Sequence, residues 1–208
     1  VGVQPTRLVL TADGRYAIVN ESTWGSSNLP GNRDHYALRV IDLDSMEIVH
    51  ELEPRSNALW HGLTIVDSDP TTIWATDGLK NHIMEFTLSP DGILEESRRI
   101  TLPDCYTTDI VISPMQDTAY VTCLTSDTSL LRGYVTVVDL ETEEIEKLPP
   151  LRGPFSLALS ADGTQLFVGS IGSLARPRNG DSVTVIDTET LTTTTTISVG
   201  WKSYSVAG

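Results

Sequence analysis

Histidine and carboxylate side chains are the groups in this chain most able to do chemistry, as acids and bases or as metal ligands. The four histidines show no HxH or HxxxH spacing, so the usual ligand pattern of a zinc or haem site is missing. Two acidic pairs have ligand-like spacing, Asp42/Asp44 and Asp67/Asp69. An EF-hand loop counted from Asp42 would need glycine at its sixth position, where Glu47 stands. We interpret these pairs as strand ends and turns, and we expect no metal and no cofactor.

Local catalytic motifs are missing from the sequence. It contains no GxSxG elbow, no P-loop, no GxGxxG that opens a helix and no recognisable Cys-His arrangement. An active site can also be assembled from single residues on several separate segments, which no local motif reveals. The sequence therefore favours a protein without catalytic residues and leaves an enzyme as the alternative.

Cys105 and Cys123 are the only two cysteines, and their spacing fits neither CxxC nor CxxCH. We expect Cys105 to open one strand and Cys123 to end the next antiparallel strand, which brings both to the same end of the pair. A disulfide is feasible in an oxidising compartment. The alternative is a pair of buried free thiols that act as small apolar side chains.

The chain is strongly acidic, with 28 acidic against 14 basic residues and a formal net charge of −14 at pH 7. Such a surface repels the phosphates of nucleic acids and of anionic lipids. No apolar run approaches the roughly 18 consecutive residues that would span a bilayer. We therefore expect neither a nucleic-acid partner nor insertion into a membrane.

A hairpin-like stretch recurs along the chain. LVLTADGRYAIVN, which begins at Leu8, returns almost unchanged as LALSADGTQLFVGS at Leu157. A second hairpin follows each copy, and its first apolar strand ends in aspartate, at Asp42 and Asp187. A third copy carries Asp139 at this place, and a more divergent copy fills residues 62–100. The spacing of about fifty residues indicates a repeat protein.

Each copy has the pattern of four strands, because alternating Val, Ile, Leu and Thr are interrupted by turn residues such as Asp-Gly. In the first unit we predict strands near residues 6–11, 15–20, 36–42 and 46–52. The pentathreonine at 192–196 is β-branched throughout and favours an outer strand. Almost no helix is expected.

Four-stranded units repeated at forty to fifty residues are typical of a β-propeller, because one blade alone cannot bury both of its apolar faces. We therefore predict an all-β fold, a β-propeller of four-stranded antiparallel blades. The predicted units cover residues 1–55, 56–103, 104–153 and 154–200, with the first strand of a fifth at 201–208.

The sequence pattern of the repeat resembles that of the YVTN family of β-propeller repeats, found in surface-layer proteins and in many secreted or periplasmic proteins. The fourth unit matches best, at Pro154, Asp162-Gly163, Phe167-Val168, Val185-Ile186-Asp187 and Val199-Gly200. The second unit departs from the pattern, with Asp69-Pro70 in place of Asp-Gly and Glu85-Phe86 in place of Ile-Asp. The resemblance implies an extracellular, cell-surface or periplasmic location. It also implies seven or so blades, so we expect a longer chain or a second copy to close the propeller.

The strand order predicts that the loops between second and third strands share one end of the blades with the joints between blades. These loops are long at residues 21–35, 124–132 and 171–180. Long loops on a rigid scaffold often bind partners, although they can also be unconstrained surface. The candidate residues of this binding face are Trp24, Arg33, Asp34, His35, Trp60, His61, Asp104, Tyr106, Arg176 and Arg178.

His61 stands where the innermost strand of the second unit begins, close to the expected mouth of the central channel. An imidazole there could bind a metal or transfer a proton, and a structural histidine with satisfied hydrogen bonds is the alternative. Trp60 beside it is expected to pack between blades.

Two functions from different classes remain. The sequence favours a noncatalytic extracellular or periplasmic scaffold that presents its loops to a protein, a glycan or a neighbouring subunit. The alternative is a lactonase-like hydrolase, or the propeller subunit of a redox complex, with its site near His61. A bound metal or cofactor would discriminate between them.

Overall fold

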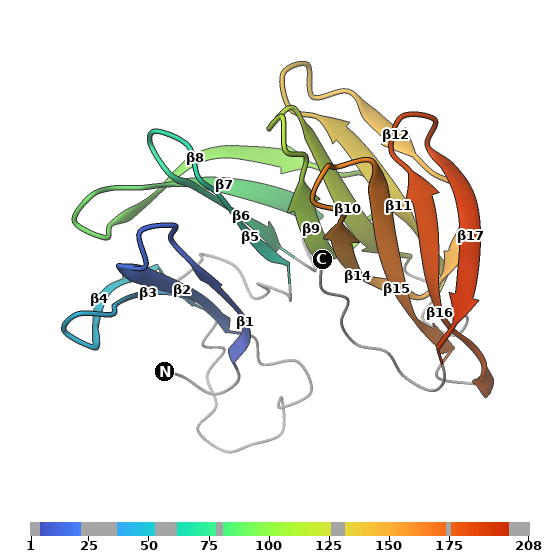
Figure 1. Cartoon of the computed structure of the whole chain (residues 1–208), viewed down its shortest axis with the longest axis horizontal. Coiled ribbons are helices and arrows are strands. Elements are labelled where there is room, and N and C mark those ends of the chain that lie inside the picture. Colours follow the sequence, from blue (N-terminus) through green and yellow to red (C-terminus); the bar gives the residue numbers. More distant parts are fainter. Residues whose placement is uncertain are drawn as a thin grey trace. The chain divides into compact units, whose positions relative to one another are not determined.

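The computed structural model describes residues 5–21, 37–52, 62–77, 81–125, 132–173 and 176–199. It confirms the all-β prediction: these residues form strands β1 to β17 and no helix (Figure 1). The strands build four antiparallel sheets, and each sheet is one propeller blade. The chain divides into two compact units, Val1–Thr101 and Leu102–Gly208, with two blades in each.

The first unit contains blades 1 and 2. Blade 1 consists of β1 (Pro5–Leu10), β2 (Tyr16–Glu21), β3 (Leu38–Asp42) and β4 (Glu47–Leu52). Blade 2 consists of β5 (Leu63–Val66), β6 (Thr72–Asp77), β7 (His82–Leu88) and β8 (Leu94–Thr101). Strands follow one another across each sheet in chain order, and the strands of blade 1 begin and end within two residues of the predicted ones.

The second unit contains blades 3 and 4. Blade 3 consists of β9 (Tyr106–Ile112), β10 (Thr118–Leu124), β11 (Arg132–Asp139) and β12 (Ile145–Lys147), and the short β13 (Leu151–Arg152) also pairs with β11. Blade 4 consists of β14 (Pro154–Leu159), β15 (Gln165–Ser173), β16 (Arg176–Asp187) and β17 (Thr192–Ser198).

Apolar side chains from both blades form the core of each unit. In the first unit, Ile18 and Val40 of blade 1 pack with Ile73, Met84 and Phe86 of blade 2. These side chains are at most 2% exposed. Burial of apolar area between sheets stabilises both partners, so a blade depends on its neighbour.

The second unit is built in the same way and adds a polar link between its blades. Tyr120 and Val135 of blade 3 pack with Leu157 and Val168 of blade 4. The buried Asp109 of β9 accepts a hydrogen bond of 2.8 Å from the backbone N–H of Leu157. This carboxylate therefore fixes the first strand of blade 4 against the first strand of blade 3.

Aspartates close the outer hairpins of three blades. In Asp42, Asp139 and Asp187, Oδ1 accepts hydrogen bonds of 2.7–3.1 Å from the backbone N–H groups of the residues two and three positions later. Such local hydrogen bonds fix a turn. The recurring aspartate of the sequence is thus a turn residue, which confirms the interpretation of Asp42 as a strand end.

The inner hairpins use a related arrangement. The hydroxyl of Thr11 donates to Asp13 at 2.5 Å, and the Arg15 backbone N–H donates to the same oxygen at 3.0 Å. In blade 4, Asp162 likewise accepts from the hydroxyl of Ser160 at 2.6 Å and from the backbone N–H of Thr164 at 3.1 Å. The repeated hairpin therefore has the same hydrogen bonds in both copies.

Acid should destabilise the protein through these turns. The hydroxyl of Ser160 is the largest cause that lowers the pKa of Asp162 from 3.8 to about 2, and backbone N–H donors lower the pKa of Asp139 and Asp187. A carboxylate with a depressed folded-state pKa stabilises the fold above its unfolded pKa, and that stability is lost as the pH falls through the folded pKa. We expect the free energy of unfolding in urea to fall between about pH 4 and pH 2. The variant Asp162→Asn should lose part of this acid dependence, and an unchanged pH profile would contradict the assignment.

Two equivalent turn glycines provide a matched pair for a packing test. Gly14 and Gly163 have φ of 71° and 72°. A Cβ at Gly163 would lie 2.7 Å from Cδ of Pro114 in the inner turn of blade 3, whereas a Cβ at Gly14 would have no atom within 4 Å. Alanine should therefore cost about 1–2 kcal/mol at either site for its left-handed backbone and about 1–3 kcal/mol more at Gly163. Equal losses of unfolding free energy for the two alanine variants would show that the inner turns of blades 3 and 4 do not pack together.

Candidate functional site

In each blade the candidate site is the end at which the second strand finishes and the third begins, which we call the loop end. Comparable positions, at or next to the end of the second strand, are Glu21 on β2, Asp77 on β6 and Cys123 on β10. All three side chains are at most 2% exposed. Each is joined to a residue on another segment, and we call these three contacts the loop-end ties.

The tie in blade 1 joins three strands by charge. The guanidinium of Arg39 on β3 donates to the buried carboxylate of Glu21 and, through Nε at 2.9 Å and Nη2 at 3.2 Å, to Glu51 on β4. A buried carboxylate is tolerated only when it is paired and hydrogen-bonded. The tie therefore joins the strands on either side of residues 22–36, where most of the predicted loop 21–35 lies.

The tie in blade 2 is a histidine–carboxylate contact. Nδ1 of His82, the first residue of β7, lies 3.3 Å from Oδ2 of Asp77, the last residue of β6. The two residues flank residues 78–81, so their contact holds together the end of β6 and the start of β7.

The tie in blade 3 is covalent. A disulfide joins Cys105, just before β9, to Cys123 on β10, with an S–S distance of 1.96 Å and a Cα–Cα distance of 4.8 Å. Of the two alternatives for the cysteines, the structure therefore contains the disulfide. On the same segment, the hydroxyl of Tyr134 donates to the carbonyl oxygen of Asp104 at 2.9 Å, and Lys147 donates to that of Pro103 at 3.0 Å. The segment that leads into blade 3 is thus bound to three residues of that blade, Cys123, Tyr134 and Lys147.

The predicted binding-face residues fall only partly within the described structure. Asp104 is exposed in the joint before β9, and the half-buried Tyr106 begins β9 opposite Leu124. Arg176 and Arg178 belong to β16, but their side chains lie outside the description. The remaining candidates lie outside the described residues: Trp24, Arg33, Asp34, His35, Trp60 and His61. The structure therefore brings Asp104 and Tyr106 together with the disulfide and leaves the other positions as predictions.

Asn20 forms a glycosylation sequon with Glu21 and Ser22. In the structure the Asn20 side chain is on β2 and 0% exposed. A glycan cannot be accommodated there without opening the strand, so the sequon is not a surface site in the folded protein.

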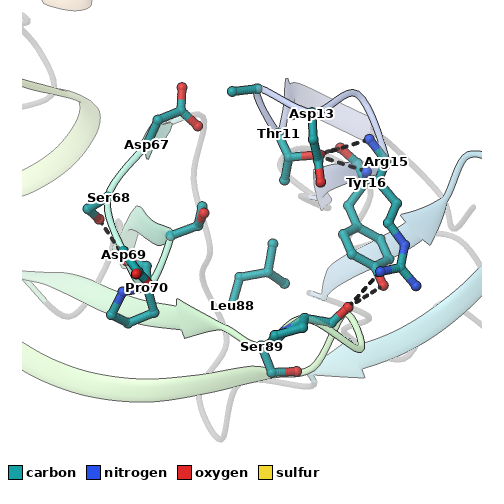
Figure 2. A pocket seen from close by; sticks show the side chains of 13 residues that line it. Thr11, Asp13, Arg15, Tyr16, Asp67, Ser68, Asp69, Pro70, Leu88 and Ser89 are labelled. Carbon is teal, nitrogen blue, oxygen red and sulfur yellow. Dashed lines mark hydrogen bonds between the residues drawn. The ribbon is translucent and has the colours of Figure 1, made fainter.

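A pocket of about 560 Å³ lies at the opposite end of the first unit, between the inner turn of blade 1 and the two turns of blade 2. Figure 2 shows Asp13 and Tyr16 on one wall, Asp67 and Asp69 on the other, and Leu88 between the walls. The hydroxyl of Thr11 is engaged by Asp13, and the hydroxyl of Ser68 donates to the carbonyl of Pro70. The exposed carboxylates of Asp67 and Asp69 are thus the pocket groups best placed to accept further hydrogen bonds.

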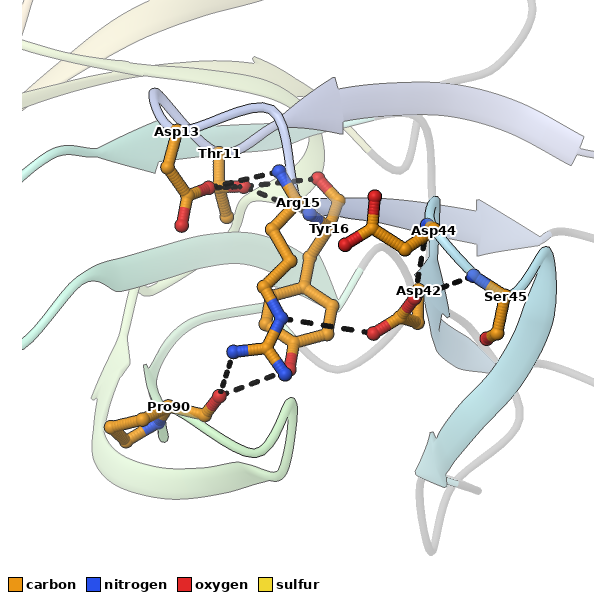
Figure 3. A network of polar contacts seen from close by, with 8 residues as sticks. All are labelled: Thr11, Asp13, Arg15, Tyr16, Asp42, Asp44, Ser45 and Pro90. Atoms are coloured by element: carbon orange, nitrogen blue, oxygen red, sulfur yellow. Dashed lines mark hydrogen bonds and ion pairs between the residues drawn. The ribbon is translucent and has the colours of Figure 1, made fainter.

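A polar network fixes the blade 1 wall of this pocket (Figure 3). Arg15 and the hydroxyl of Tyr16 both donate to the carbonyl oxygen of Pro90, at 2.9 and 3.0 Å. Arg15 Nε also lies 3.7 Å from Asp42. The outer turn of blade 2 is thereby held against blade 1.

Sequence reasoning did not predict this pocket, although the repeat carried a signal for it. The inner hairpin of blade 2 has five residues between its last matched pair, Val66 and Thr72, whereas the other three inner hairpins have six. Asp69-Pro70 also replaces Asp-Gly there. In the second unit the turns equivalent to those of the pocket walls lie in contact, at Gly163 and Pro114. The divergence of the second repeat therefore coincides with the opening between turns.

Within the described ranges, no group of three or more His, Cys, Asp or Glu side chains could hold a metal ion. The same ranges contain no helix long and apolar enough to cross a membrane.

Four-stranded antiparallel blades that bury their faces against one another define a β-propeller protein. Solved structures share this fold with the chain over 96–97% of its length. They include hydrazine synthase of Kuenenia stuttgartiensis (TM-score 0.68, 18% identity) and a functionally unknown protein of Desulfotomaculum acetoxidans DSM 771 (0.68, 15%). A third, from Bacteroides fragilis NCTC 9343, bears a provisional assignment as a 6-phosphogluconolactonase (0.63, 16%).

The chain spans 52%, 58% and 56% of these three proteins, respectively. At such low identity the likeness concerns the fold alone. The chain matches no known family pattern. It also matches no curated protein by sequence.

Proposed function

We propose that this protein is a noncatalytic interaction module, built from propeller repeats of the YVTN type, that presents its loop end to a protein partner. The observation that carries this proposal is the set of three loop-end ties. In blades 1, 2 and 3 the buried residue at or next to the end of the second strand is held by an ion pair, a histidine–carboxylate contact or a disulfide, close to where the connecting segment leaves. A rigid base reduces the entropy that is lost when loops bind a partner.

We further propose that the protein works outside the cytoplasm, at the cell surface or in the periplasm. The Cys105–Cys123 disulfide supports this location, because disulfides persist mainly in oxidising compartments. A protein, a glycan or a neighbouring subunit could occupy the loop end. A protein fits best, because Trp24, Arg33 and Tyr106 are of the residue types enriched at protein interfaces.

Site-specific photo-crosslinking in the source cells tests this function. A benzophenone amino acid would replace Trp24, Arg33 or Arg176 at the predicted loop end and, as matched controls, Met46 or Met115, which are 75% and 80% exposed on turns at the other end. We expect a discrete crosslinked partner from the loop-end positions and none from the two methionines. Adducts from the methionine positions alone would contradict the proposal. A metal or an absorbing cofactor in the purified protein, with an activity lost in His61→Ala, would replace it with the enzyme alternative.

A further inference from the structure

β17 differs from the other outer strands of the described blades in its charge. The outer strands β4, β8 and β12 all carry charged side chains, namely Glu47 and Glu51, then Glu95, Glu96, Arg98 and Arg99, then Glu146 and Lys147. β17 has the sequence TTTTTIS and carries none. Charges on an outer strand are a common means by which proteins prevent pairing with other strands.

β17 is also exposed along its whole length. Each of its seven residues is exposed, Ile197 by 49%, and Val199 just beyond it by 47%. β17 is the last strand of its sheet, shown in red in Figure 1, and among the strands of the described residues only β16 pairs with it. Its outward backbone N–H and C=O groups are therefore available to another strand.

The bulge in β17 does not explain the difference. The pairing with β16 shifts between Val185 and Ile186, and the hydroxyl of Thr194 donates to the carbonyl oxygen of Val185 at 3.2 Å. The β3–β4 and β7–β8 pairs contain the same kind of shift next to outer strands that are charged. The missing charge is thus the distinguishing property of β17.

We propose that β17 is a self-association surface, on which β17 of a second copy of this chain pairs antiparallel and continues the sheet β14–β17. A two-fold pairing places each strand opposite itself, so charged outer strands such as β4 would bring acidic residues near one another. In the register centred on Thr194, β17 brings threonine opposite threonine over its whole pentathreonine, and Thr–Thr pairs on neighbouring strands are favourable. The inference concerns a different surface from the loop end and does not depend on the proposed function.

The proposal has a characteristic salt dependence. Each copy has a formal net charge of −14, so the two copies repel each other at long range while the paired strands are neutral. Salt screens that repulsion over a Debye length of about 10 Å at 0.1 M and about 3 Å at 1 M. Association should therefore tighten as sodium chloride is raised, whereas an interface based on ion pairs would weaken.

Sedimentation velocity of the whole chain at increasing concentration tests the inference. We expect a reversible monomer–dimer equilibrium that shifts towards the dimer at higher salt. Thr193→Lys/Thr195→Lys should weaken association by at least about tenfold, because like charges then face each other across the pair. The control Met115→Lys adds charge of the same sign on an exposed turn and should leave the dimer unchanged.

A charge-swap mixture separates pairing from misfolding. Thr193→Glu/Thr195→Glu should also be monomeric alone, and an equimolar mixture with the lysine variant should recover association to within a few-fold of the original. A monomeric parent chain, a lysine variant that dimerises normally, or a mixture that stays monomeric would each overturn the proposal.

Discussion

Replacing Arg39 by alanine is expected to lower the free energy of unfolding of the first unit by about 3–5 kcal/mol. The substitution leaves the carboxylate of Glu21, which is 0% exposed, without the guanidinium that pairs with it. A charge that loses its partner inside the protein is far more costly than a broken surface pair. Urea denaturation followed by tryptophan fluorescence would measure the loss, since Trp74 lies in this unit and is 2% exposed.

Two further variants define the cause of this loss. Glu21→Gln/Arg39→Ala removes the buried charge together with its partner and should be more stable than Arg39→Ala alone. Arg99→Ala breaks the ion pair with Glu96, in which the Arg99 and Glu96 side chains are 41% and 39% exposed. It should lower the free energy of unfolding by at most about 1 kcal/mol. A loss from Arg39→Ala no larger than that from Arg99→Ala would show that the blade 1 tie is not a buried pair.

Removal of the disulfide is expected to destabilise the second unit by about 3 kcal/mol. The bond closes a loop with a sequence separation of 18, and a crosslink of that length restricts the unfolded chain by about this amount in the chain-entropy description. Cys105→Ser/Cys123→Ser should therefore unfold at a lower temperature and a lower urea concentration than the parent chain.

Reduction provides the internal control for this prediction. Dithiothreitol should lower the free energy of unfolding of the parent chain to near that of the double serine variant. It should not change the free energy of unfolding of that variant. A parent chain that loses no stability on reduction would contradict the contribution assigned to the crosslink. A mass that rises by two hydrogen atoms on reduction would show independently that the bond was present.

The loop-end ties show the limit of sequence reasoning about the candidate site. The long loops were predicted from the number of residues between the expected strands, and a disulfide between Cys105 and Cys123 was one of two alternatives left open by their expected place on neighbouring strands. The pair Glu21–Arg39 was not predicted. Its two residues are 18 apart, and nothing in the sequence around Glu21 distinguishes a buried carboxylate from the many exposed ones. The pocket of the first unit was missed for the same reason, since its walls come from three turns.

The sequence by itself determined the fold class, the four-stranded blades and the role of Asp13, Asp42, Asp139, Asp162 and Asp187 as turn residues. These properties depend on interactions between near neighbours in the chain. Their sequence pattern recurs in several blades, which makes it recognisable. Only the tertiary structure decided which carboxylates are buried, which cysteine state occurs and where two turns separate to form a pocket. Those properties depend on packing between distant segments, as in the hydrogen bond from Leu157 to Asp109 across 48 residues, and such packing leaves no local pattern in the sequence.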